Sequence, residues 1–132
     1  MSFDLHSERG DRFAFSRAGW GYYLNLADKY GWQAAGTLPP SGMPDPEIWP
    51  KTYDSNDGQR VSQDDAEALA KALQAALDDP RRVERLTMAA KEESEALTRA
   101  TGRPCRVRVE ANDAEYIRQM IEFFKKGGFR IS

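Results

Sequence analysis

The stretch SQDDAEALAKALQAALDDP, residues 62–80, contains the strongest secondary-structure signal in this chain. Ser62 is a favoured N-cap residue, and Asp65 three positions later completes a capping box. Pro80 ends the helix, because proline cannot continue the backbone hydrogen-bond ladder. Between these ends the apolar residues recur at helical spacing and form one stripe, made of Ala66, Leu69, Ala70, Leu73, Ala76 and Leu77. The stretch predicts an amphipathic helix whose small alanines allow a second element to approach closely.

Three further helices are expected around this one. The first follows an N-cap at Ser16 and ends at Gly31, where glycine accepts a left-handed conformation. The second follows Pro80 and covers residues 81–100. The third follows an N-cap at Asn112 and continues to about residue 126. Apolar side chains at helical spacing, together with Trp32, give the predicted core: Trp20, Tyr23, Leu24, Trp32, Leu69, Leu73, Leu77, Ile117, Ile121 and Phe124.

Short strands are predicted at residues 13–16, 105–110 and 129–131, the last as an edge strand. A small hairpin is also expected between Thr52-Tyr53 and residues 59–61. Residues 1–12 are interpreted as a polar N-terminal lead-in, and residues 13–132 as one globular domain. The predicted fold class is therefore α+β: a mostly helical single domain with about four helices and a small sheet of two to three strands.

Residues 36–50 form a proline-rich loop that contains five of the seven prolines. Proline excludes both a helix and a central strand there. The favoured interpretation is a stiff extended loop that carries Ile48 and Trp49 over the core. The alternative is that this loop is a proline-rich ligand for an aromatic groove on another protein.

Composition limits the range of functions. A chain of 132 residues with 40% hydrophobic residues has the size and composition of one globular domain. The net charge of -2 and the pI near 5.5 disfavour a general nucleic-acid-binding protein. A single cysteine rules out an internal disulfide and fits a reducing compartment. The N-terminus lacks the apolar run of a signal peptide, and no stretch is apolar enough to span a membrane. We therefore expect a cytoplasmic protein that binds neither nucleic acid nor membranes.

The polar stretch YDSNDGQRVS, residues 53–62, is the principal candidate for a site. An EF-hand loop would require its glycine one position later than Gly58, so calcium binding of that kind is disfavoured. The favoured interpretation is a tight turn, since asparagine, aspartate and glycine tolerate positive φ. The alternative is a small-ligand or enzymatic pocket in which aromatic and polar groups converge. Its predicted residues are Trp49, Tyr53, Asp54, Asn56, Asp57 and Gln59.

The chain offers no recognisable catalytic constellation, so no catalytic residue, metal ligand or cofactor is predicted. Cys105 lies among arginines, but the single histidine, His6, is far from it in sequence. Arginine is favoured at protein interfaces because of its planar fork of donors. A protein-binding surface is therefore considered at Arg81, Arg82, Arg85, Arg106 and Arg108.

Four segments resemble a group of uncharacterised bacterial proteins: FAFSRAGWGYYLNLADKYGW, GTLPP, YDSNDGQRVSQDDAEALAKAL and FFKKGGFRIS. The resemblance covers more than a third of the chain and implies no activity or site residues. Small acidic proteins of this kind are similar in size and charge to immunity proteins of toxin systems. The functional hypothesis from the sequence is a non-enzymatic protein-binding module with an unknown protein partner. An immunity-type inhibitor is the candidate class for this module.

Overall fold

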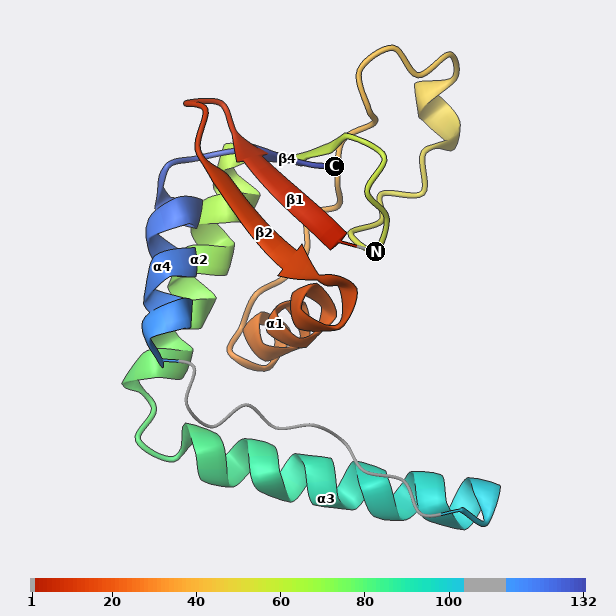
Figure 1. The fold of residues 1–132 in the computed structure, drawn as a ribbon, viewed down its shortest axis with the longest axis vertical. Helices are drawn as coiled ribbons and strands as arrows, with labels where there is room; N and C mark the ends of the chain where they lie inside the picture. The colour runs from red at the N-terminus through yellow and green to blue at the C-terminus, as the bar shows by residue number, and fades with distance from the viewer. Residues whose placement is uncertain (1, 104–113) are drawn as a thin grey trace.

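This computed structural model describes residues 2–103 and 114–132. Within these ranges the chain has an α+β fold with four α-helices and a four-stranded antiparallel sheet, as predicted in class and helix number (Figure 1). In chain order the elements are β1 (Ser2–Ser7), β2 (Arg12–Ser16), α1 (Arg17–Lys29), the short 3-10 helix η1 (Pro46–Ile48), β3 (Gln59–Val61), α2 (Gln63–Asp78), α3 (Arg82–Thr101), α4 (Ala114–Lys125) and β4 (Phe129–Ile131).

The sheet is larger than predicted, with the strand order β2-β1-β4-β3. Residues 2–7 are a strand near the middle of this sheet, so the interpretation of residues 1–12 as a polar lead-in is wrong. Strand β1 pairs with β2 on one side and with β4 on the other. Phe3 and Leu5 point inward and are buried, while Asp4 and His6 alternate with them.

Two further strand predictions need correction. Strand β4 is not an edge strand, because it lies between β1 and β3. Residues 52 and 53 form no hairpin with residues 59–61, since β3 pairs with β4 and Arg60 forms an isolated bridge with Leu38. The predicted strand at 105–110 lies outside the described residues. The strand predicted at 13–16 is confirmed as β2.

The core lies between one face of the sheet and the helices α1, α2 and α4 (Figure 1). Helices α2 and α4 pack along each other, and the alanines Ala66, Ala70 and Ala76 of α2 are buried. Aromatic side chains connect the layers, as where Phe124 of α4 stacks on Phe129 of β4 at 5.3 Å between ring centroids. Burial of each such side chain contributes about 1.5–3 kcal/mol.

The predicted helix starts are confirmed where they can be compared. Ser16 accepts a hydrogen bond from the Gly19 amide at 3.0 Å, and Ser62 accepts one from the Asp65 amide at 3.2 Å. The predicted core is also confirmed, except that Leu77 is only half-buried. The N-cap predicted at Asn112 lies outside the described residues. None of the helices described is both long and apolar enough to cross a membrane.

Candidate functional site

The polar stretch before β3 is organised by the side chain of Gln59, which is completely buried. Its Nε2 donates to the backbone oxygens of Thr52 and Ser55, at 3.2 and 2.6 Å. Its Oε1 accepts a hydrogen bond from the Asp57 amide at 2.9 Å. A buried amide group bonded on both its donor and acceptor sides stabilises the loop that surrounds it. Gln59 therefore holds this loop in shape from the inside.

Tyr53 contacts a second buried group, the carboxylate of Asp65. The Tyr53 hydroxyl donates a hydrogen bond to Oδ2 of Asp65, and Trp32 Nε1 donates to Oδ1 at 2.9 Å. The Gly36 amide donates to the Tyr53 hydroxyl at 3.0 Å. Burial raises the pKa of Tyr53, and the hydrogen bond to the Asp65 carboxylate raises it further. Asp65 was expected to complete a capping box, but its carboxylate binds these two side chains instead.

All three tryptophans use their indole N–H to fasten this region. Trp32 binds Asp65, as described above, and Trp20 Nε1 donates to the backbone oxygen of Tyr53 at 2.8 Å. Trp49 Nε1 donates to Thr37 Oγ1 at 3.0 Å, and that hydroxyl donates to the Thr52 backbone oxygen at 2.7 Å. Indole N–H groups that are removed from water need such partners. Two of the partners, the Tyr53 backbone and Thr37, lie in the chain between α1 and β3, and the third, Asp65, lies in α2.

The structure separates the six predicted ligand-binding residues into two groups. Trp49, Tyr53 and Gln59 point into the protein, and their polar atoms already have partners there. Asp54 and Asp57 are exposed, and Asn56 is half-buried. Gly58 has a φ of +88°, in agreement with the predicted turn geometry. Within the described residues, no three histidine, cysteine or acidic side chains gather as a metal-binding group would. The arrangement supports the turn interpretation more than a pocket.

An open groove of about 580 Å³ lies elsewhere, along the outer side of α2 near the end of α4. It is lined by Glu67, Ala70, Lys71, Gln74, Ala75, Asp78 and Lys125. None of the six predicted ligand-binding residues lines this groove. Its charged side chains are mixed in sign, which favours no single class of charged ligand.

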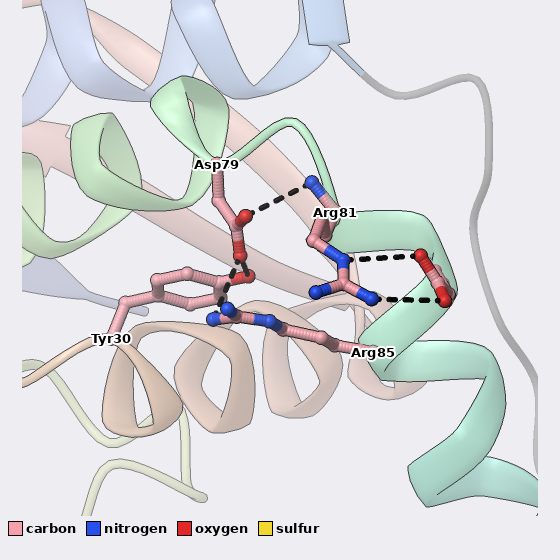
Figure 2. A network of polar contacts seen from close by, with 5 residues as sticks. Tyr30, Asp79, Arg81 and Arg85 are labelled. Carbon is pink, nitrogen blue, oxygen red and sulfur yellow. Dashed lines mark hydrogen bonds and ion pairs between the residues drawn. The ribbon is translucent and has the colours of Figure 1, made fainter.

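Three of the five predicted arginines meet where α2 turns into α3. Figure 2 shows the acid at the centre of this corner, Asp79, whose Oδ2 accepts a hydrogen bond from the Tyr30 hydroxyl at 2.7 Å. Arg85 Nη1 lies 3.3 Å from the same oxygen, and the Arg81 amide donates to Oδ1 at 2.9 Å. Arg82 is buried. These contacts join the end of α1 to the α2–α3 corner.

The electrostatics of this corner shift two pKa values in opposite directions. Burial, with the hydrogen bond to Asp79, raises the pKa of Tyr30 to about 12. The Tyr30 hydrogen bond and the Arg81 amide lower the pKa of Asp79. The Arg81 side chain pairs with Glu84 at 3.3 Å, so both exposed arginines of the corner have acidic partners. Arg106 and Arg108 lie outside the described residues.

Sequence reasoning missed the structural importance of Asp65 and Thr37. Asp65 lies four residues before Leu69, on the buried stripe of α2. The helical spacing alone therefore indicated that the Asp65 side chain points into the protein. Thr37 is buried within the proline-rich region and had no comparable signal.

No family model, curated protein or solved structure matches this chain.

Proposed function

We propose that this chain is a protein-binding module, and that part of its contact surface is the proline lobe, defined here as residues 38–51. The observation that carries the proposal is the exposure of Ile48, which retains 69% of its accessible surface on the 3-10 turn of the lobe. The sequence predicted that Ile48 would cover the core, and that expectation is wrong. In Figure 1 the lobe projects away from the sheet and the helices.

The lobe is fastened at its base, which favours a preformed contact surface. Thr37 bonds both Trp49 and the Thr52 backbone, as described above, and the Thr37 amide donates to the Lys51 backbone oxygen at 3.4 Å. Lys51 itself has a left-handed φ of 58°, a conformation that costs a non-glycine residue free energy. A fastened loop that presents an apolar side chain loses less conformational entropy on binding than a disordered one.

Within the protein-binding modules, we propose the class of immunity-type inhibitors. This assignment is a prediction from the size and net charge of the chain. The small-ligand alternative has less support, because the polar atoms of Tyr53 and Gln59 already bond the protein itself. The partner's identity would decide the class: a toxic enzyme captured in stoichiometric amount would make the chain an immunity protein.

The test is affinity capture from a lysate of the source organism, read by mass spectrometry, with matched variants. We expect wild type to retain a stoichiometric partner and Ile48→Ser to lose at least about tenfold in affinity, as at an interface hot spot. Met88→Ser is the control, because Met88 is 60% exposed but lies on α3. Capture that is absent in wild type, or equal in the Ile48→Ser protein, would contradict the proposal.

A further inference from the structure

The sheet has an outer face, made of the side chains that alternate with the buried ones. Its register places one residue of each strand in a single row across this face. His6 of β1 lies opposite Arg12 of β2 and opposite Arg130 of β4. Arg130 in turn lies opposite Arg60 of β3. We call Arg12, His6, Arg130 and Arg60 the basic row; it spans about 14 Å, because neighbouring strands lie about 4.8 Å apart.

The charges of the basic row work against the stability of the sheet. Arg60 and Arg130 are exposed, and within the described part of the chain neither forms an ion pair. Like charges directly opposite each other on neighbouring strands are destabilising. Arg12 has a partner, since its Nη2 lies 2.9 Å from Oδ1 of Asp4. The uncompensated positive charge is therefore concentrated at Arg60 and Arg130, on the β3 side of the sheet.

We propose that the basic row binds an acidic segment of a partner polypeptide, whose carboxylates pair with Arg60 and Arg130. The guanidinium group offers a planar fork of donors that matches a carboxylate with two hydrogen bonds. A carboxylate between the two arginines would also remove their mutual repulsion. The inference rests on the proposed function, because it names the chemistry of the protein partner.

The distribution of aromatic side chains favours a polypeptide over a nucleic acid. Sheets that bind single-stranded nucleic acid stack the bases on exposed aromatic side chains. Here Phe3, Phe15 and Phe129 are buried on the opposite face. Phe13 also faces the helices, where its ring packs 5.4 Å from that of Tyr116. The strands therefore supply cations to the outer face without an aromatic stacking platform.

The basic row is continuous with the proline lobe at its β3 end. Leu38 forms an antiparallel bridge with Arg60, and their reciprocal N···O distances are 2.8 and 3.1 Å. The Leu38 side chain is 44% exposed and extends the row by one apolar residue. A partner segment that lies along the row thus meets an apolar residue next to the arginines. The expected binding segment contains acidic residues beside at least one apolar residue.

Fluorescence anisotropy tests the inference, with a labelled oligoglutamate peptide and a labelled oligothymidylate of equal length at low ionic strength. We expect the full chain to bind oligoglutamate more tightly, and added salt to weaken the complex. The double variant Arg60→Gln/Arg130→Gln should lose about tenfold in affinity. Arg118→Gln is the matched control, since this exposed arginine lies on α4. The double variant should keep or raise its melting temperature, which separates lost binding from lost folding.

Three results would overturn the inference: no binding of oligoglutamate, equal or tighter binding of oligothymidylate, or oligoglutamate binding that survives the double substitution. Ile48→Ser separates this inference from the proposed function, because it should release the cellular partner without affecting oligoglutamate binding. If oligoglutamate fails to bind while partner capture still depends on Ile48, the inference fails and the proposed function stands. If oligoglutamate binds through the arginines while Ile48→Ser leaves partner capture intact, the lobe proposal fails instead.

Discussion

Trp32 Nε1 lies 2.9 Å from Oδ1 of Asp65, and this buried hydrogen bond fastens the chain after α1 to the first turn of α2. The two residues are separated by 33 positions in sequence. The Asp65 carboxylate also accepts a hydrogen bond from the Tyr53 hydroxyl, so one acid joins three segments of the chain. With 2% of its surface exposed, Asp65 depends on these partners to offset the cost of burying its charge.

Asp65→Ala should therefore lower the free energy of unfolding by about 3 kcal/mol, because it leaves the Trp32 and Tyr53 donors without their acceptor. Urea denaturation measures this loss. Asp64→Ala is the control: its side chain is exposed in the same helical turn, and it should cost no more than about 1 kcal/mol through the helix dipole. Equal losses for the two variants would show that Asp65 acts only as a first-turn acid.

Tyr53 and Tyr30 should make the protein sensitive to alkali. Both pKa values are raised in the folded state, that of Tyr30 to about 12 from an ordinary value of 10.0. Above about pH 10 the unfolded chain loses protons that the folded chain retains, so stability falls as pH rises through the folded-state values. Below about pH 10 the stabilising contribution of each tyrosine is fully present.

Tyr53→Phe should cost about 1–2 kcal/mol near neutral pH, through the lost hydrogen bond to Asp65. The difference from wild type should narrow as the pH rises above about 10. Urea denaturation at a series of alkaline pH values measures the difference. A difference in stability between wild type and Tyr53→Phe that stays constant with pH would mean that the Tyr53 hydroxyl has the same pKa in the folded and unfolded states.

Gln59→Ala should destabilise the protein by about 3 kcal/mol, because it leaves the Thr52 and Ser55 carbonyls and the Asp57 amide without their buried partner. Tryptic cleavage after Lys51 should also become faster, as the loop loses its internal support. Asp57→Ala is the control, since its exposed carboxylate leaves the backbone bond to Gln59 unchanged, and it should stay within about 0.5 kcal/mol of wild type. If Gln59→Ala is as harmless as Asp57→Ala, the residue is available for a ligand and the pocket alternative gains support.

Local sequence patterns predicted the elements whose formation depends on neighbouring residues. The stripe from Ala66 to Leu77 and the cap at Ser62 predicted α2 closely, because helix period and capping are set within a few residues. The alternation of Phe3 and Leu5 with polar residues was the matching signal for β1, but two apolar residues are a short pattern.

Long-range contacts were beyond the same reasoning. Strand β1 is stabilised by β4 from the other end of the chain, and no local pattern reports such a partner. The same limit explains Asp65, whose local role as a capping residue was predicted and whose contact with Trp32 was not. At Ile48, apolar character suggested burial, whereas its position on a fastened lobe leaves it exposed.

Asp79 should contribute stability that is lost in acid. Its pKa is lowered in the folded state, chiefly by the Tyr30 hydroxyl and then by the Arg81 amide. The contribution is fully present above the ordinary value of 3.8 and disappears as pH falls through the lower folded-state value. Asp79→Asn should therefore be less stable than wild type near neutral pH, and the difference should shrink below about pH 4.

Urea denaturation at a series of acidic pH values measures that difference. Asp78→Asn is the control for Asp79→Asn, because the Asp78 side chain is exposed and accepts a hydrogen bond from the Gln74 side-chain amide of the same helix, at 3.1 Å. We expect it to stay close to wild type at every pH. Tyr30→Phe should remove part of the acid sensitivity, because it takes away the strongest donor to Asp79. A difference between wild type and Asp79→Asn that persists unchanged into strong acid would show that the corner is held by packing and not by the charge of Asp79.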